Sequence, residues 1–238
     1  MLPSLRDWSK KNMTINEYFG DWLKVIDRNE LNRVTKTING LYQTQDVMPE
    51  YKNIFKAFHL CPYNNLKIIF IGQDPYPQKG IATGILFGNK EGTKQLSPSL
   101  EIIKEACIDY TIPHYSPIKF DITLESWAKQ GILMLNSSLT VQVNKPGSHS
   151  LIWRPFITRL LKNLSIKETG LVYVLFGKDA QSFKPAINHE YNDIVEIKHP
   201  AYYARTNTSL PSDLFRFINR IMYGRYGVSI KFYEQENN

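Results

Sequence analysis

Short apolar runs alternate with amphipathic segments along most of this chain. Four runs show no regular alternation with polar residues, which is typical of parallel strands covered on both faces. They are Lys67–Ile71, Ile132–Leu135, Leu171–Phe176 and Ile194–Ile197. The segments between them show helical spacing. The clearest stripe, at i, i+4, i+7, i+8 and i+11, is Trp153, Ile157, Leu160, Leu161 and Leu164. Strands alternating with helices predict a three-layer α/β/α fold with a central four-stranded, mostly parallel sheet.

Helix boundary signals support this division. Ser97-Pro98 predicts an N-cap followed by proline at the first helical position. Thr123 is expected to cap a helix over Leu124–Gln130. The last helix is predicted to end before Gly224 and to bury Leu214, Phe217, Ile218 and Ile221. We expect a single domain over 1–238, with a helical N-terminal part (about 1–65) and an α/β core (about 66–224).

Composition narrows the class of protein but does not identify it. Of the 238 residues, 21% are charged and 42% hydrophobic, which is ordinary for a soluble globular protein. The net charge of +7 permits a nucleic-acid partner without requiring one. Cys61 and Cys107 are too few for a zinc ribbon or an iron–sulfur cluster, and we expect two reduced, buried thiols.

The chain shows neither a signal peptide nor a membrane span. Its first residues lack the apolar segment of a signal peptide, and no apolar run is long enough to cross a bilayer. We therefore expect a soluble protein without a membrane partner. Its expected place is the cytoplasm, or the nucleus if the source is a eukaryote or a nuclear virus.

Polar residues follow the predicted strands where they end. Asp74 stands in a proline turn after the first strand, Asn136 ends the second, and His199 follows the fourth. Taken singly, each has an ordinary structural explanation, as a turn or loop residue. The carboxyl ends of parallel strands share one edge of a sheet, however, and ligands bind there. Their joint placement therefore predicts an active site.

Several motifs around these residues resemble those of family 1 uracil-DNA glycosylases, across roughly residues 45–220. The run Leu124–Val141 is the most specific. The matching segments are Gly72–Tyr76, Gly84–Phe87, Ser97–Leu100, Leu124–Asn136, Leu139–Val141, Ser148–Ser150 with Trp153, and His199–Pro200.

Two positions depart from the family pattern. Pro77 stands where the family usually has histidine, although a viral branch also carries Asp-Pro-Tyr-Pro. After His199-Pro200 the family usually continues Ser-Pro-Leu-Ser, whereas this chain has Ala201-Tyr202-Tyr203-Ala204. Tyr203 takes the place of the leucine that fills the duplex after base flipping, and we expect it to be the wedge.

The resemblance implies a hydrolase that flips uracil out of DNA and hydrolyses the N-glycosidic bond. This leaves an abasic site and begins base excision repair. It implies catalytic roles for Asp74 and His199. The substrate-binding residues would be Gln73, Tyr76, Phe87 and Asn136, and the DNA-binding residues Ser99, Ser148, Tyr203 and Arg205.

The residue types suit these implied roles. The Asn136 amide can accept from uracil N3–H and donate to O4, a pair that cytosine does not offer. Tyr76 would stand beside C5 and exclude the thymine methyl, while Phe87 stacks on the base. His199 would donate a hydrogen bond to O2 as charge develops there. Asp74 would stabilise the cationic sugar and orient the attacking water.

The implied partner is uracil-containing DNA, single- or double-stranded. We expect a monomer without metal or cofactor, which a uracil-glycosylase inhibitor protein or a replication protein can bind. Two alternatives remain open: a replication-accessory protein with little activity, and a glycosylase of altered base range. An unrelated nucleotide-binding protein is disfavoured because no glycine-rich phosphate loop follows the first strand.

Overall fold

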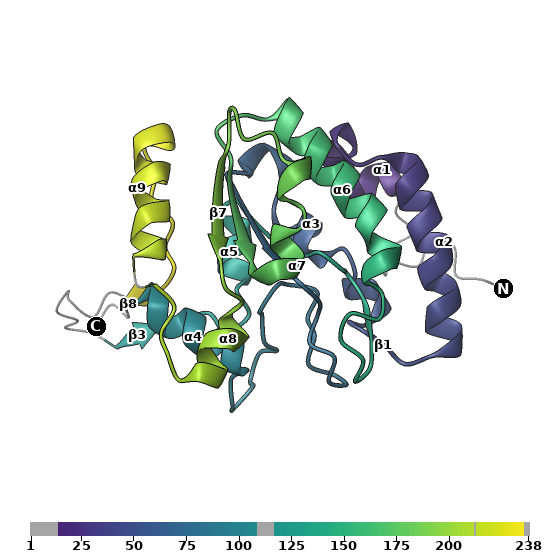
Figure 1. Cartoon of the computed structure of the whole chain (residues 1–238), viewed down its shortest axis with the longest axis horizontal. Coiled ribbons are helices and arrows are strands. Elements are labelled where there is room, and N and C mark those ends of the chain that lie inside the picture. Colours follow the sequence, from purple (N-terminus) through teal and green to yellow (C-terminus); the bar gives the residue numbers. More distant parts are fainter. Residues whose placement is uncertain (1–13, 109–116, 212, 236–238) are drawn as a thin grey trace.

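A parallel sheet of four strands runs through the middle of the molecule (Figure 1). The structure is a computed structural model, which describes residues 14–108, 117–211 and 213–235. The strands lie in the order β4 (Ile132–Asn136), β2 (Ile68–Gly72), β6 (Val172–Phe176) and β7 (Asp193–Ile197), and every neighbouring pair is parallel. The predicted strands and the predicted fold class are thereby confirmed.

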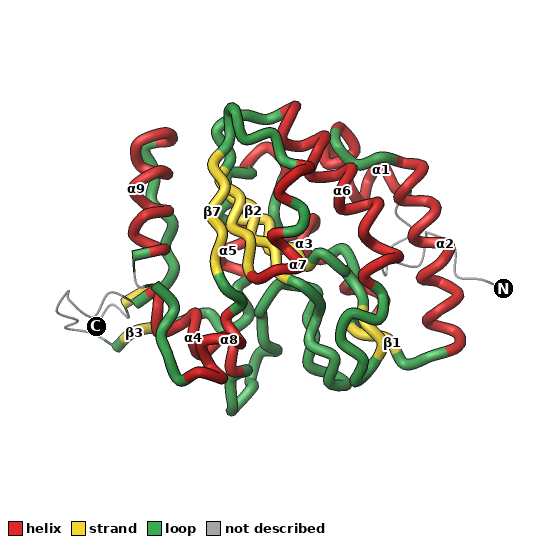
Figure 2. The backbone as a smooth tube through the Cα atoms, viewed as in Figure 1, coloured by secondary structure: helices red, strands yellow, loops and turns green. Residues whose placement is uncertain are grey.

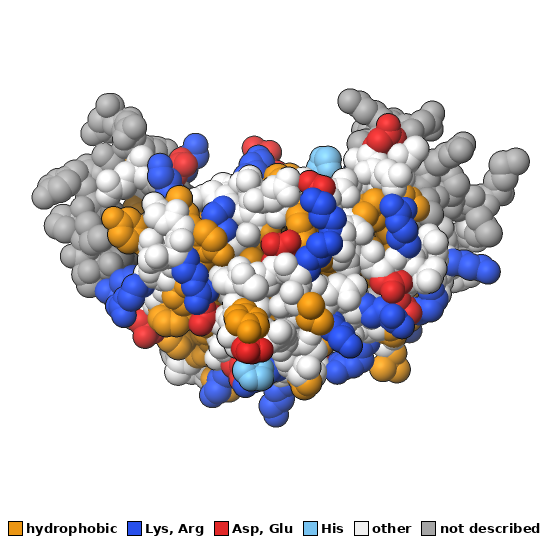
Figure 3. All heavy atoms as spheres, turned by 90° about the horizontal axis from the view of Figure 1, so that it is seen from above, with side chains coloured by type: hydrophobic (Ala, Val, Ile, Leu, Met, Phe, Trp, Pro, Cys, Tyr) orange, Lys and Arg blue, Asp and Glu red, His pale blue; other side chains and the backbone are white. Residues whose placement is uncertain are grey.

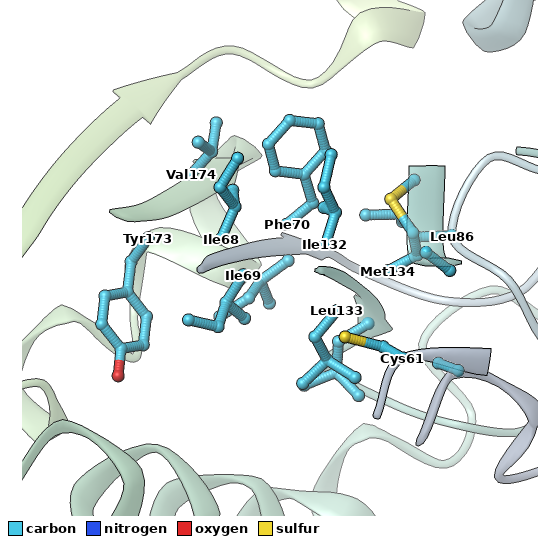
Figure 4. Close-up of a cluster of buried hydrophobic side chains, with 14 of the residues drawn as sticks. Cys61, Ile68, Ile69, Phe70, Leu86, Ile132, Leu133, Met134, Tyr173 and Val174 are labelled. Carbon is cyan, nitrogen blue, oxygen red and sulfur yellow. The ribbon is translucent and has the colours of Figure 1, made fainter. Parts of the chain in front are cut away.

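The two inner strands, β2 and β6, and the edge strand β4 are buried along their whole length. Figure 4 shows why their sequences lack a polar alternation: successive side chains point to opposite faces, and both faces are covered. Phe70 and Met134 point to one face, and Ile69 and Leu133 to the other. The sheet is therefore the central layer of a continuous apolar core.

Helices cover both faces of the sheet (Figure 1). On one side lie α2 (Arg28–Thr44) and α6 (Ser150–Lys167), the helix predicted from the stripe that begins at Trp153. On the other lie α4 (Pro98–Cys107), α5 (Glu125–Lys129) and α9 (Leu214–Tyr226). The Trp127 ring joins this second layer to the sheet, since its centroid lies 6.3 Å from that of Phe70 and 5.8 Å from that of Phe215.

Shorter elements complete the described chain. The N-terminal part has α1 (Ile15–Phe19), η2 (Gly20–Lys24), η3 (Tyr51–Asn53), α3 (Lys56–Leu60) and η4 (Tyr63–Asn65). Two small antiparallel pairs join β1 (Val47–Met48) to β5 (Val141–Gln142) and β3 (Ile118–Lys119) to β8 (Glu234–Gln235). A 3-10 turn, η5 (Lys184–Ala186), precedes β7. The single-domain organisation with its boundary near residue 65 stays a prediction.

The predicted helix boundaries need three corrections. Thr123 is not the N-cap of α5, because Leu124 holds that position with φ +58°. The Thr123 hydroxyl still accepts from a backbone N–H of the helix, that of its first residue, Glu125. The last helix continues past Gly224. Its Phe217 side chain is exposed and Ile221 only half-buried, because the buried stripe is Leu214, Phe215, Ile218 and Met222.

The loops and short helices that follow the strands gather at one end of the sheet, the end where the strands finish (Figure 2). Helix α7 (Gly177–Gln181) follows β6 directly, and α8 (Pro200–Thr206) follows β7. Figure 3 shows the opposite end of the molecule, where the described basic side chains are scattered among acidic and apolar ones. Cys61 and Cys107 are buried free thiols, as predicted. Within the described ranges, no helix is long and apolar enough to span a membrane.

Candidate active site

The turn that carries Asp74 and the end of β4 leave the sheet side by side. Gly72 pairs with Asn136 in the parallel ladder. The ladder then continues into the loops, where the N–H groups of Ser137 and Ser138 donate to the carbonyls of Gly72 and Gln73, both at 2.9 Å. Backbone pairing therefore fixes the spacing between Asp74 and Asn136.

Asp74 is a half-buried carboxylate with one oxygen bound and one free. Its Oδ2 accepts from the Gly147 N–H at 2.6 Å, while its buried Oδ1 has no hydrogen-bond partner in the structure. Burial raises the pKa of Asp74 to about 6; the Gly147 N–H opposes that rise, and the charge of Asp179 adds to it. A buried, partnerless acceptor of this kind is costly and points to a ligand.

Asn136 and Asp74 line the same narrow pocket, together with Tyr76 and Phe87. Asn136 is 5% exposed, and its Oδ1 is a second buried acceptor without a partner. The free space in the pocket is about 10 Å³, about what one water molecule needs. The pocket must therefore widen before a pyrimidine can enter.

The two aromatic walls of the pocket are tied to each other. The Tyr76 hydroxyl donates to the Phe87 carbonyl at 3.1 Å and lies 2.5 Å from Ser97 Oγ. Ser97 occupies the N-cap position of α4 as predicted, but its hydroxyl donates to Asn89 and makes no capping bond. Phe87 has φ +62°, a strained conformation for a non-glycine residue that is typical of functional sites.

His199 stands beside the pocket, with its ring edge-on to Phe87. It is the N-cap of α8, and its Nδ1 accepts from the Ala201 N–H at 3.2 Å. In the neutral ring the proton is therefore on Nε2. Burial lowers the pKa of His199, Arg205 lowers it further, and Asp179 opposes both. The result is a neutral imidazole with an N–H donor.

The predicted DNA-binding residues have different surroundings. Ser148 and Arg205 are exposed, although Ser148 Oγ already accepts from the Gln142 N–H at 2.8 Å. Ser99 is buried. Gln73 is half-buried, and its carbonyl accepts a further bond from Ser137 Oγ at 3.1 Å.

A family model described as the uracil DNA glycosylase superfamily matches residues 58–222. This chain belongs to the uracil DNA glycosylase superfamily. A uracil-DNA glycosylase of Brevibacillus brevis is 34% identical over 212 residues, which cover 86% of this chain and 90% of the relative. One of Campylobacter lari is 39% identical over 189 residues, which cover 79% and 80%.

Solved structures of the superfamily share the fold. A crystal structure of a mimivirus UNG variant in complex with UGI matches with a TM-score of 0.75 and 23% identity. The match covers 85% of this chain and 82% of that one. A crystal structure of mimivirus uracil-DNA glycosylase matches with a TM-score of 0.70 and 20% identity, over 92% and 91% of the two chains.

The departure after His199 is the clearest difference between expectation and structure in this member of the superfamily. Tyr203 is 9% exposed and belongs to the hydrophobic core, so its ring is not placed to enter DNA. The exposed aromatic is Tyr202, at 37%, with Lys198 Nζ 4.0 Å from its ring centroid. Both tyrosines lie on the same turn of α8. The position four residues after the histidine, which the family resemblance pointed to, is the one whose side chain faces the core.

Sequence reasoning assigned no role to three residues at this superfamily site. Gly147 supplies the bond to Asp74, and Asp179 on α7 adds a second carboxylate near Asp74 and His199. Gly177 lets α7 approach His199, because a Cβ there would lie 2.9 Å from His199 Cβ. The strand end at Gly177 was the one available signal. Within the described residues, no group of three or more His, Cys, Asp or Glu is placed to hold a metal ion.

Proposed function

We propose that this chain is a monofunctional uracil-DNA glycosylase, which flips uracil from DNA and hydrolyses its N-glycosidic bond. The observation that carries this is the pair of buried, partnerless oxygens, Asp74 Oδ1 and Asn136 Oδ1. Both belong to one pocket that is walled by Tyr76 and Phe87. A site with unpaired acceptors binds a ligand that supplies donors, and rejects one that does not.

Base recognition rests on Asn136 and the two aromatic walls. The free Asn136 Oδ1 accepts from uracil N3–H, and its amide donates to O4. Cytosine presents an acceptor and an amino group at these positions, so one asparagine orientation leaves it mismatched at a cost of about 1–3 kcal/mol per unpaired group. The Tyr76 ring, held by its bond to the Phe87 carbonyl, excludes the methyl group of thymine.

Bond cleavage uses two opposite charges that develop together. The sugar becomes cationic, and the free oxygen of ionised Asp74 stabilises it and orients the attacking water. The departing uracil becomes anionic at O2, where His199 donates its Nε2–H. A neutral histidine suits this role because a uracil anion is already a weak base that needs a hydrogen bond more than a full proton. Neither role needs a metal ion.

The surroundings of the site suit a DNA backbone. Lys178, Lys198 and Arg205 are exposed on α7, before α8 and on α8, and they add affinity by counterion release. Ser148 and the N–H groups of the loops would contact phosphates. The chain would act as a monomer where DNA is kept, in the cytoplasm of a bacterial cell or in a nucleus.

One related structure suggests a protein partner. The mimivirus UNG variant was crystallised with UGI, so a uracil-glycosylase inhibitor is the protein partner that we propose for this chain. Such an inhibitor would block uracil excision when bound at the DNA-binding edge. A replication partner stays a prediction from the sequence.

The test is base release from an oligonucleotide with a single uracil, in EDTA, followed by alkaline cleavage of abasic sites. A thymine oligonucleotide of the same sequence is the control. We expect cleavage at uracil only, undiminished by EDTA. Activity that EDTA abolishes and zinc or magnesium restores would contradict the mechanism. DNA binding without cleavage would favour an accessory protein.

A further inference from the structure

The segment Gln142–Ser148, here named the clamp loop, lies against the turn that carries Asp74. It begins at the last residue of β5 and leads into α6. Its Gly147 N–H makes the one hydrogen bond that the described structure gives to the Asp74 carboxylate, at 2.6 Å. The contact is made by a backbone N–H, which is why sequence motifs do not reveal it.

The clamp loop is anchored on three sides. The Val143 N–H donates to the Asp46 carbonyl at 2.9 Å, and the Asn144 N–H donates to the Pro77 carbonyl at 3.0 Å. Ser148 Oγ accepts from the Gln142 N–H at 2.8 Å and closes the loop on itself. Pro77, the residue that departs from the family pattern, is therefore one of the anchors.

Gly147 is suited to its place by its backbone conformation. Its φ of +78° lies in the left-handed region, which is unfavourable for residues with a Cβ by about 1–2 kcal/mol. Space is not the reason, since the nearest atom to an added Cβ would be Ser150 Oγ at 3.8 Å. The left-handed turn is what aims the N–H at Asp74.

The bond to Gly147 has two consequences for the carboxylate. It fixes the rotation of the side chain, so that Oδ2 is bound and Oδ1 stays free. It also favours the charged form of a group whose burial favours the neutral form. The charge of Asp179 on α7 also acts on Asp74, and Tyr76 and His199 stand at the same pocket. The cations at this edge, Lys145 of the clamp loop, Lys178, Lys198 and Arg205, are exposed.

We infer that the clamp loop positions the Asp74 carboxylate for the reaction through the Gly147 N–H, and that Ser148 holds the loop in this conformation. Gly147 and Ser148 are positioning residues, because they act through Asp74. The effect on rate rests on the proposed function, whereas the effect on the carboxylate does not.

The decisive variant replaces the Gly147 amide by an ester, with glycolic acid at position 147, which exchanges the N–H for an oxygen that cannot donate and leaves every side chain in place. Two readouts are compared with the wild type: the titration midpoint of Asp74, from the NMR signal of its carboxyl carbon, and the pH dependence of single-turnover uracil excision. A hydrogen bond to a charged group typically shifts a pKa by about one unit or more. We expect the Asp74 midpoint to rise by about that much.

The rate should follow the ionised fraction of Asp74. For a one-unit rise from about 6, the ionised fraction falls about fivefold at pH 6, about twofold at pH 7 and hardly at all near pH 9. Any loss of rate that remains near pH 9 measures the misplaced carboxylate. DNA affinity should stay unchanged.

Side-chain variants provide the matched comparison. Ser148→Ala should raise the midpoint in the same direction by a smaller amount, and Ser148→Thr, which keeps the hydroxyl, should restore it. Ser150→Ala should leave it unchanged, since the Ser150 hydroxyl makes no hydrogen bond among the described residues. If the ester variant does not fold, the serine series carries the test.

An Asp74 midpoint that is the same in the wild type, the ester variant and Ser148→Ala overturns the inference. If the wild type excises no uracil, the proposed function fails, and the NMR midpoints still decide whether the clamp loop controls Asp74.

Discussion

The His199 imidazole lies edge-on against the Phe87 ring, with 5.5 Å between ring centroids and 72° between planes. The residue proposed to stack on the base therefore also supports the residue proposed to donate to it. Phe87 is in turn packed against Phe176 at the end of β6, at 5.2 Å. The donor is thus held by the core of the sheet.

Replacing His199 with leucine should remove the donor and keep the apolar contact with Phe87. Because the bond to O2 strengthens as charge develops, we expect the single-turnover rate to fall by about 10²–10³ while DNA affinity changes little. Single-turnover kinetics measure the effect on the rate, and a binding titration measures the effect on DNA affinity. A loss confined to binding would contradict the proposed role.

Replacing Asp74 with asparagine should stabilise the fold while it abolishes most activity. The pKa of Asp74 is raised from 3.8 to about 6, so its charged form is less favourable in the folded than in the unfolded state. The penalty is absent below pH 4, develops as the pH rises through this interval, and is complete above about 6. At pH 7.5, Asp74→Asn should be more stable by up to about 3 kcal/mol.

Denaturant unfolding of the wild type and Asp74→Asn at pH 4 and pH 7.5 checks this expectation. The stability difference should be present at pH 7.5 and nearly vanish at pH 4. If the stability difference between Asp74→Asn and the wild type is the same at both pH values, or if the variant is the less stable protein at pH 7.5, then the ionised form of Asp74 does not destabilise the fold.

The two tyrosines of α8 should respond in opposite ways. Tyr202→Ala removes an exposed ring and should change stability by less than about 1 kcal/mol. If that ring stacks on bases beside the flipped nucleotide, excision from duplex DNA should slow about tenfold, and excision from single strands much less. Tyr203→Ala opens a cavity in the core and should destabilise by about 3 kcal/mol.

Excision from duplex and single-stranded substrates, measured beside thermal unfolding, tests both variants. Tyr202→Phe is the control that keeps the ring. A duplex-specific loss in Tyr203→Ala with an intact fold would restore the original assignment of the wedge.

The strands could be predicted from the sequence because each is a continuous apolar run. Asp74 and Asn136 could be predicted to lie together because each stands at or just after the end of such a run. The continuous apolar run ending in Asn136 places that residue wherever the strand ends, and parallel strands share an edge. Side-chain direction within a short helix carries no such signal. Tyr202 and Tyr203 are adjacent tyrosines, and only packing against the core decides that the second one is buried.

Contacts made by backbone groups could not be predicted from the sequence either. The Gly147 N–H reaches Asp74 from 73 residues away, and a loop glycine carries no mark of its partner. The Ser97 hydroxyl, predicted as a cap, is drawn away by Tyr76 and Asn89. A helix begins there nonetheless, because proline at its first position sets the backbone.

Tyr76 should control discrimination against thymine through its ring alone. Tyr76→Ala should admit thymine, because the space beside C5 is vacated. Tyr76→Phe keeps the ring and loses only the bonds to the Phe87 carbonyl and Ser97, so it should still reject thymine. Excision from uracil and thymine oligonucleotides by the three proteins checks this. If the wild type, Tyr76→Ala and Tyr76→Phe all reject thymine equally, the Tyr76 ring does not contact the base.

The central claim is that the unpaired amide oxygen of Asn136 reads uracil. Asn136→Asp tests it most directly, because a carboxylate can accept from the amino group of cytosine. The measurement is the ratio of single-turnover excision rates on uracil and cytosine in otherwise identical oligonucleotides. We expect the wild type to act on uracil alone, and the variant to lose uracil activity and to release cytosine. An unchanged uracil-to-cytosine ratio in a folded Asn136→Asp variant would contradict the account.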